Sequence, residues 1–318
     1  MRRNGVSDPW AIVLAGGEGS RVQPFLAELC GGRGIKQFCT IIGDRSMLQH
    51  TVSRVQKLTR KERILVSLNS RHRSDATEQL SVLSPENLIF QPTNLDTAPG
   101  ILLPLAHISH RDPDAVVAVF PSDHFIRNEE SFMACAARAV RELKRHRDAL
   151  ILLGLSPEWP DDSYGWIEPA VVQHHQGSVP VQAFFEKPDP TEARKLMLRG
   201  SLWNTFVFVA RAEVLWKMVA ASAPELYCIF STIRLMLPSD HTRSVIEFAY
   251  RSLRPVNFSS AVLTRSSSHL RVIRVPPVGW SDWGTKERIL ASLEEIGRLE
   301  ECLQRLNSPV PEESIQAG

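Results

Sequence analysis

A glycine-rich segment near the N-terminus has the composition of a phosphate-binding loop. Residues 14–21 read Leu-Ala-Gly-Gly-Glu-Gly-Ser-Arg and follow a short apolar run, residues 10–14. Glycines let backbone N–H groups converge on an anion, because no Cβ stands in the way. Arg21 adds a cation with several donors. The segment therefore favours a phosphate site, with an ordinary strand-to-helix turn as the alternative.

Two common phosphate-binding motifs do not fit this region. A Walker A loop needs a Gly-Lys pair followed by a hydroxyl residue. Here Ile35 separates Gly34 from Lys36, and Gln37 takes the hydroxyl position. A dinucleotide fingerprint needs a third glycine, and Val22 stands in that place. The phosphate chemistry is therefore of another kind.

Two aspartates stand just beyond predicted strands, where they could bind a metal ion. Asp123 follows the apolar run 116–120, and Asp282 follows the run 272–275 after a turn that contains proline and glycine. Open α/β sheets place ligand sites at such strand ends. Two carboxylates together with phosphate oxygens and water would suit Mg²⁺. Each aspartate could instead cap a helix or close a turn.

Two lysines offer the complementary charge. Lys36 lies in a polar interruption before an apolar run, and Lys187 ends the strand-like run 181–186. A lysine at the end of a strand can reach into a cleft as a point charge for phosphate. An ordinary surface charge is the alternative for each of them.

Alternating elements in the first half predict the fold that would position these residues. Strand-like runs cover residues 11–14, 64–68, 88–91, 116–120 and 149–155. Helical patterns cover residues 47–58, 98–109 and 129–147. Such alternation predicts an α/β fold, with a mostly parallel sheet flanked by helices on both faces.

The second half predicts an α+β extension on the edge of that sheet. Strand-like runs cover 164–168, 181–186 and 203–210, and a short helix is expected near 191–198. Apolar residues spaced by threes and fours predict one helix over 285–306, packed on the protein's own core or in a homodimer seam. We expect one domain over 1–284, with halves of about 8–155 and 156–284, and a C-terminal helix and tail over 285–318.

Composition narrows the class of protein. The chain has 318 residues, 43% hydrophobic and 23% charged, as in ordinary globular proteins. A net charge of +2 gives no electrostatic reason to expect nucleic acid as a partner. No apolar run has the length of a membrane span or of a signal peptide. Five scattered cysteines suggest free thiols in a reducing compartment. We expect a cytoplasmic protein without a membrane or nucleic-acid partner.

Several segments together resemble the sugar-1-phosphate nucleotidyltransferases, and among these the mannose-1-phosphate guanylyltransferases. The loop 14–21 is similar to the family's signature loop, and Lys36 with its neighbours is similar to the lysine segment. The other matching segments are 97–99, 120–124, 164–166, 186–188, 203–204 and 279–282. Each match is short, but together they follow the family's order from residue 10 to about 285.

The resemblance implies the Rossmann-like fold of the nucleotide-diphospho-sugar transferases and the transfer of a nucleotide to a sugar 1-phosphate. It implies GTP and mannose 1-phosphate as substrates, and GDP-mannose and pyrophosphate as products. The implied catalytic residues are Arg21, Lys36 and Lys187. The implied nucleotide-binding residues are Leu14, Ala15, Gly16, Gly17, Gly19, Ser20, Arg21, Thr97, Ala98 and Ser122. The implied sugar-phosphate-binding residues are Tyr164, Gly165, Glu186, Lys187 and Asn204, and the implied Mg²⁺ ligands are Asp123 and Asp282.

Departures from the family's pattern keep two alternatives open. Leu95 and Asp96 stand where arginine and asparagine are common, which removes a cation near the nucleotide. Phe206 stands where the family has glycine, so a bulky side chain enters the sugar region, and Ile35 replaces a proline before Lys36. One alternative is a related enzyme that uses UTP or dTTP with another hexose 1-phosphate. The other is a regulatory subunit that binds nucleotide sugars without turnover.

Overall fold

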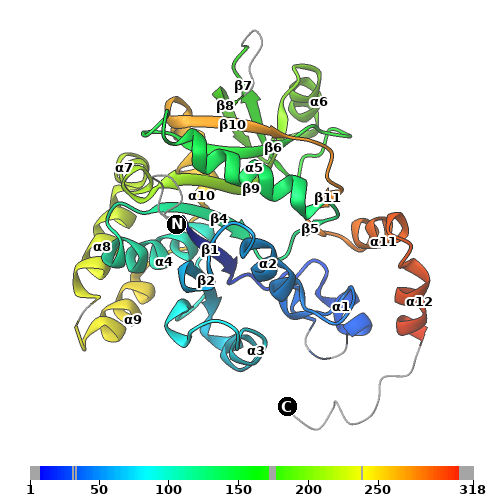
Figure 1. Ribbon diagram of the computed structural model, residues 1–318, viewed down its shortest axis with the longest axis horizontal. Helices are drawn as coiled ribbons and strands as arrows, with labels where there is room; N and C mark the ends of the chain where they lie inside the picture. The colour runs from blue at the N-terminus through cyan, green and yellow to red at the C-terminus, as the bar shows by residue number, and fades with distance from the viewer. Residues whose placement is uncertain (1–7, 31, 33, 172–176, 238, 308–318) are drawn as a thin grey trace, which may run out of the picture.

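A nine-stranded sheet with helices on both faces forms the centre of the molecule (Figure 1). This computed structural model describes residues 8–30, 32, 34–171, 177–237 and 239–307, so the expected tail beyond 307 lies outside the described residues. The strands are β1 (Trp10–Ala15), β2 (Ile64–Asn69), β3 (Leu88–Gln91), β4 (Val116–Pro121), β5 (Phe125–Ile126), β6 (Leu150–Leu155), β7 (Gly165–Pro169), β8 (Val179–Glu186), β9 (Leu202–Arg211), β10 (Leu270–Val275) and β11 (Trp280–Ser281). The helices are α1 (Gln23–Cys30), α2 (Met47–Val55), α3 (Arg73–Gln79), α4 (Thr97–Arg111), α5 (Glu129–Glu142), α6 (Pro190–Leu198), α7 (Ala212–Ser222), α8 (Pro224–Met236), α9 (Thr242–Ser252), α10 (Phe258–Ala261), α11 (Lys286–Glu295) and α12 (Leu299–Asn307).

The strand order is β3-β2-β1-β4-β9-β6-β10-β8-β7. The strands of the first half pair in parallel, β1 with β2 and β4, and β2 with β3. β9 runs antiparallel to both β4 and β6, while β10 is parallel to β6 and β8 is antiparallel to β10. Most strands therefore point in one direction, with β8 and β9 reversed, which confirms the predicted α/β sheet and its mixed extension.

The strands read as nearly continuous apolar runs because helices cover both faces of the sheet. In β1, Ile12 faces the core beneath α4, α7 and α8, and Val13 faces the core beneath α2, α3 and α5. Both side chains are completely buried. The same alternation continues in β4 and β6, so the strand ends at the cleft are held on a rigid base.

A two-stranded ribbon of β5 and β11 stands apart from the large sheet. It pairs Phe125 with Ser281 and Ile126 with Trp280 in antiparallel register. Neither strand was expected from the sequence, because each has only two residues. The ribbon joins chain segments that lie more than 150 residues apart, and both segments border the predicted metal ligands.

The C-terminal region differs from the sequence prediction. In place of one helix over 285–306, α11 and α12 are separated by Gly297, whose φ is 68°. The apolar spacing continues across this break, which hides it in the sequence. α12 turns back against α1, as the orange and red helices of Figure 1 show. The predicted helix over 129–147 also ends early, at Glu142.

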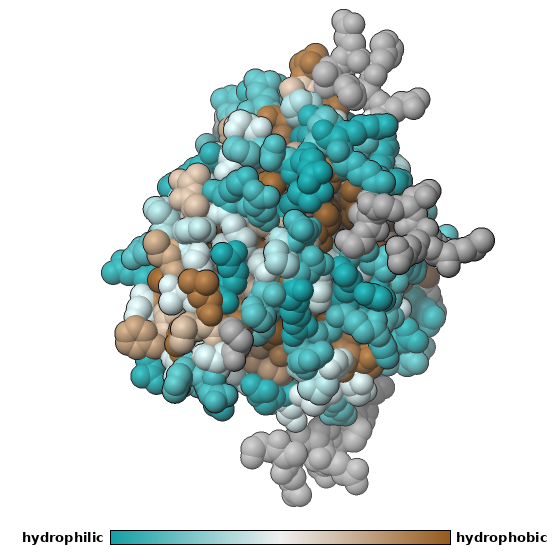
Figure 2. All heavy atoms as spheres, turned by 60° about the vertical axis from the view of Figure 1, so that its left-hand side comes forward, coloured by the Kyte–Doolittle hydropathy of each residue, from teal (hydrophilic) through white to brown (hydrophobic). Residues whose placement is uncertain are grey.

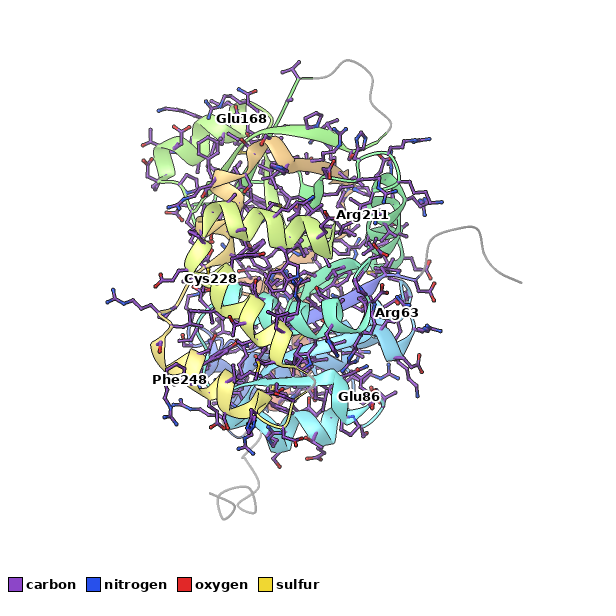
Figure 3. The ribbon with its side chains drawn as sticks, turned by 90° about the vertical axis from the view of Figure 1, so that its left-hand side faces the viewer. Arg63, Glu86, Glu168, Arg211, Cys228 and Phe248 are labelled. Atoms are coloured by element: carbon purple, nitrogen blue, oxygen red, sulfur yellow. The ribbon has the colours of Figure 1, made fainter. Side chains whose placement is uncertain are left out.

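Helices α7, α8 and α9 form an outer layer that the sequence prediction did not contain. Figure 2 shows this side of the molecule as mostly hydrophilic, with hydrophobic side chains among the polar ones. Figure 3 places Cys228 and Phe248 on this layer, and Phe248 is 72% exposed. Within the described ranges, no helix combines the length and the apolar character that a membrane span requires.

Candidate active site

A cleft of about 600 Å³ is lined by residues of both predicted halves. The predicted site residues that line it are Leu14, Gly16, Gly17, Gly19, Arg21, Thr97, Ser122, Asp123, Tyr164, Gly165, Glu186, Lys187, Asn204 and Asp282. Ser20 and Lys36 line an adjoining hollow that shares Asp123 and Asp282 with the cleft. Ala15 and Ala98 do not line either space, since both side chains are buried in the wall.

The glycine-rich loop begins where β1 ends, and a buried glutamine holds it. The amide Nε2 of Gln37 donates to the carbonyl oxygens of Ala15 at 3.0 Å and Gly17 at 2.7 Å. A Cβ on Gly16 would come within 2.9 Å of the side chain of Gln91, whereas a Cβ on Gly17 would meet no atom within 4 Å. The side chains of Gln37 and Gln91 therefore contact the loop on its buried side, while Gly17 leaves space toward the cleft. The sequence prediction did not recognise this function of Gln37.

Lys36 holds the two predicted metal ligands together. Its Nζ donates to Asp123 Oδ2 at 2.9 Å and also to the backbone carbonyl oxygen of Asp282. The side chain of Lys36 is buried, while that of Asp123 is 32% exposed. Gly19 adopts a φ of 61°, and a Cβ there would collide with the stem of Lys36. Lys36 thus lies between the glycine-rich loop and the two aspartates.

The β5–β11 ribbon brings Asp123 and Asp282 to the same hollow. Asp123 lies two residues before β5, and Asp282 directly follows β11. Of the described residues, no group of three or more His, Cys, Asp or Glu side chains is close enough to bind a metal ion. Two carboxylates could therefore hold a metal ion only together with other oxygens, such as phosphate and water, which is the usual coordination of Mg²⁺.

The two oxygens of Asp282 have different surroundings. Oδ1 accepts hydrogen bonds from the Tyr164 hydroxyl at 2.8 Å, Arg288 Nη1 at 2.9 Å and the Gly284 N–H at 3.1 Å. Arg21 Nη2 lies 3.9 Å from Oδ2. A Cβ on Gly284 would collide with Oδ2, so the glycine leaves this oxygen accessible. Arg288 was not predicted from the sequence, which contains no recognisable motif around it.

Opposite charges keep both carboxyl groups ionised. Burial acts to raise the pKa of Asp123, but the Lys36 ammonium, the neighbouring His124 and the hydrogen bonds to the carboxylate together lower that pKa below its ordinary value. The pKa of Asp282 is lowered in the same way against burial, by positive neighbours that include Arg288 and by the Tyr164 hydrogen bond. Burial and the Asp282 carboxylate raise the pKa of Tyr164, so its hydroxyl stays a hydrogen-bond donor.

His124 follows Asp123 and is unsuited to act as a base at neutral pH. Burial lowers its pKa to about 4, and its ring lies edge-on to the Trp280 ring, with 5.2 Å between the centroids. Its backbone oxygen accepts long, 3.4 Å hydrogen bonds from Arg54. The surroundings of His124 therefore indicate a structural neighbour of Asp123.

On the other side of the cleft, Glu186 and Asn204 are held near Gly165. A Cβ on Gly165 would come within 2.9 Å of Glu186 Oε2, so only glycine allows this approach. Burial raises the pKa of Glu186, and the neighbouring Lys187 opposes that rise. Asn204 Oδ1 accepts a hydrogen bond from the Phe206 N–H at 3.1 Å. These polar groups suit the hydroxyl groups of a small ligand.

Four non-glycine residues in the described part of the chain have positive φ, and each borders the cleft or the adjoining hollow. They are Asp96 (69°), Lys187 (48°), Phe206 (59°) and Trp283 (47°). Such conformations are strained and are found mainly at functional sites. Phe206 is thus strained at the position where the resemblance implies glycine.

The departure at Leu95-Asp96 lies where hydrogen bonds join the start of α4 to Val256 and Asn257. Leu95 is buried in the core, and its carbonyl oxygen accepts from the Val256 N–H at 3.0 Å. Asp96 caps α4, and its Oδ1 accepts from the Thr97 N–H at 2.6 Å and from Asn257 Nδ2 at 3.2 Å. Asp96 lines the cleft, so a negative charge stands there, whereas Leu95 faces away from it.

A family model and several known proteins are similar to this chain over most of its length. A family model described as nucleotidyl transferase matches residues 10–297. The xanthan biosynthesis protein XanB of Xanthomonas campestris is 31% identical over 301 residues, which cover 92% of this chain and 61% of that protein. The mannose-1-phosphate guanylyltransferase ManC of Salmonella typhimurium is 32% identical over 287 residues, which cover 87% of this chain and 58% of that protein.

A solved structure has the same fold. The protein from Thermus thermophilus described as a mannose-1-phosphate geranyltransferase superposes with a TM-score of 0.75 at 23% identity, and the match covers 87% of this chain and 77% of that one. The chain spans about 60% of the length of the two curated relatives named above. Because the family match extends over both sides of the cleft, the chain belongs to the nucleotidyl transferase family.

Proposed function

We propose that this protein transfers a nucleotide from GTP to mannose 1-phosphate, giving GDP-mannose and pyrophosphate. The observation that carries the proposal is the meeting of Lys36, Asp123 and Asp282 beside the open side of the glycine-rich loop. The family match supports the class of reaction. The choice of GTP and mannose 1-phosphate comes from relatives that are named mannose-1-phosphate guanylyltransferases.

The proposed reaction is a displacement at phosphorus. A phosphate oxygen of the sugar 1-phosphate attacks the α-phosphorus of the triphosphate, a new P–O bond forms, and the bond to the β-phosphate oxygen breaks. Pyrophosphate leaves with that oxygen and its electron pair. Such a transfer depends on positioning and on neutralisation of charge more than on covalent chemistry.

Each half of the chain has a part in this reaction. Backbone N–H groups of the loop at Gly16 and Gly17 would hold the triphosphate, with Arg21 and Lys36 offsetting its charge. On the other side, Lys187 would hold the sugar phosphate. Glu186 would accept hydrogen bonds from sugar hydroxyls, and the amide group of Asn204 would donate to them. We assign residues 8–155 to the nucleotide and 156–284 to the sugar.

We further propose that Asp123 and Asp282 hold Mg²⁺. Both are ionised carboxylates at the cleft, and Gly284 leaves Asp282 Oδ2 accessible, so the residues fit a small oxygen-preferring cation. When bound, such an ion would neutralise charge on the phosphates. The Lys36 ammonium holds Asp123 in place.

A second candidate keeps the reaction and changes the substrates. The carboxylate of Asp96 and the ring of Phe206 both line the cleft, at positions where the family has other residues. Either could favour UTP or dTTP, or a hexose other than mannose. The test must therefore vary both substrates.

The experiment is a matrix of nucleoside triphosphates and sugar 1-phosphates, with purified protein and Mg²⁺, and with pyrophosphate release as the readout. We expect release with GTP and mannose 1-phosphate. Release with mannose 1-phosphate and UTP but not GTP would overturn the choice of base, and no release with any pair would overturn the reaction. Asp123→Asn should abolish most of the turnover, and Asp114→Asn, an exposed aspartate near β4, is the matched control.

A further inference from the structure

The two oxygens of the Asp282 carboxylate differ in the number of hydrogen bonds that they accept. Oδ1 accepts three hydrogen bonds, from the Tyr164 hydroxyl, Arg288 Nη1 and the Gly284 N–H. An oxygen that accepts three hydrogen bonds has little capacity left for another ligand. Oδ2 instead faces the space that Gly284 leaves open, with Arg21 Nη2 at 3.9 Å. The surroundings therefore distinguish two oxygens that are chemically equivalent.

Arg288 is the residue that connects this carboxylate to the sugar side of the cleft. Its Nη1 binds Asp282, while its Nη2 binds Asp161 Oδ2 and, at 3.2 Å, Ser163 Oγ. The guanidinium also lies 4.7 Å from the centre of the Tyr164 ring. The planar guanidinium binds the two carboxylates through two different nitrogens held in one plane, whereas a lysine would have to reach both from a single nitrogen.

Asp161 anchors the other end of this connection. It is buried, and its carboxylate also accepts from Trp159 Nε1 at 2.9 Å and from the Ser163 N–H at 2.9 Å. Burial acts to raise its pKa, but these hydrogen bonds and Arg288 lower it below the ordinary value, so the anchor is ionised. The loop that precedes Tyr164 is thereby held to the start of α11.

We propose that Arg288 is a positioning residue, which together with Tyr164 occupies Asp282 Oδ1 so that only Oδ2 is offered to a metal ion. This inference rests on the proposed function, because that function requires a metal ion at Asp282. A carboxylate restricted to one oxygen suits Mg²⁺, which needs near-ideal octahedral geometry. Ca²⁺ accepts bidentate carboxylates and more ligands, so the arrangement also favours Mg²⁺ over Ca²⁺.

The test measures metal binding directly. Mn²⁺ is titrated into the full chain without nucleotide, and free Mn²⁺ is followed by electron paramagnetic resonance, with Mg²⁺ and Ca²⁺ as competitors. Loss of a residue that orients a metal ligand typically weakens metal affinity 10–100-fold. We expect a loss of that size in Arg288→Gln and in Arg288→Lys, together with a higher ratio of Ca²⁺ to Mg²⁺ affinity. Arg298→Gln is the matched control, since Arg298 is exposed and pairs with Glu301.

A second variant separates positioning from folding. Arg288→Gln leaves two buried or partly buried carboxylates without their cation, which could unfold the protein. Asp161→Asn combined with Arg288→Gln removes one of these charges and should recover thermal stability, but not Mn²⁺ affinity. If affinity returns with stability, Arg288 is only structural and the inference is wrong.

Two further results would also overturn the inference. These are Mn²⁺ affinity and Ca²⁺ competition unchanged in all Arg288 variants, and no Mn²⁺ binding to the wild-type protein. Failure of the proposed function is a different observation, namely no pyrophosphate release from any substrate pair by the wild-type protein.

Discussion

The two sides of the cleft are built by different means. On the nucleotide side, glycines occupy the tight positions of a short loop, and Gln37 holds that loop by two hydrogen bonds across about twenty residues. On the sugar side, Lys187 and Phe206 occupy left-handed backbone conformations without being glycines. Tyr164, on the same side, donates its hydroxyl hydrogen bond to Asp282, which lies 118 residues away. The glycine-rich loop is therefore held by residues close to it in sequence, whereas the position of Tyr164 depends on the completed fold.

Substitution of the lysine on each side of the cleft should give the largest difference in kinetic effect between the two sides. Lys36→Met removes a buried cation beside Asp123, so we expect turnover to fall about 10³-fold, similar to the loss of a donor to developing charge. Lys187→Met should mainly raise KM for the sugar 1-phosphate. Steady-state kinetics with each substrate varied distinguishes these effects. Lys57→Met, at an exposed lysine, is the control, and a change only in KM for Lys36→Met would contradict the assignment.

A second test concerns the local construction of the nucleotide side. Gln37→Ala removes two hydrogen bonds from the loop, each worth about 1 kcal/mol. We expect KM for the nucleoside triphosphate to rise about 10–30-fold, with KM for the sugar 1-phosphate nearly unchanged. Gln56→Ala, at an exposed position on the end of α2, is the control. Equal increases in both KM values would mean that the loop does not act on one side only.

The same contrast explains what the sequence could predict. The loop 14–21, Asp123 and Asp282 follow apolar runs that mark strands in a single sequence, and Lys36 lies in a polar interruption before such a run. Arg288 could not be found in this way, because its partner Asp161 lies 127 residues away and neither residue belongs to a motif.

Errors in the predicted elements have equally physical causes. The break at Gly297 lies inside an unbroken apolar pattern, so spacing alone predicted one helix. The ribbon of β5 and β11 consists of two-residue strands that have no period to detect. The positive φ of Phe206 is set by the bulge between β6 and β9, where the register shifts between Leu152 and Gly154, and this is a property of the sheet.

A fall in pH should change the free energy of unfolding in opposite directions through His107 and Glu186. Burial lowers the pKa of His107 on α4 to about 4, below its ordinary 6.5. The unfolded chain then binds the proton more readily, so stability falls as the pH drops from 6.5 toward 4, by about 3 kcal/mol. Burial raises the pKa of Glu186. The stability that Glu186 contributes is fully present below its unfolded pKa of 4.5. It is lost as the pH rises through the raised pKa of the folded state.

Urea denaturation between pH 4 and 7.5 measures both contributions. His107→Gln should reduce the loss of stability in acid, because the variant has no imidazole to protonate. Glu186→Gln should make the acid loss larger, because the opposing carboxyl group is absent. Identical pH profiles for the wild type and both variants would show that neither group differs in pKa between the folded and unfolded states.

The smallest effect concerns the strain at Phe206. Alanine at this position removes the ring but keeps a Cβ at a φ of 59°, whereas glycine removes both. A left-handed conformation costs a non-glycine residue about 1 kcal/mol, so Phe206→Gly should be more stable than Phe206→Ala by that amount in urea denaturation. Both variants should change KM for the sugar 1-phosphate to a similar extent, because both open the cleft. If glycine gives no advantage, the strain is absent, and the bulky residue is simply tolerated by the bulge.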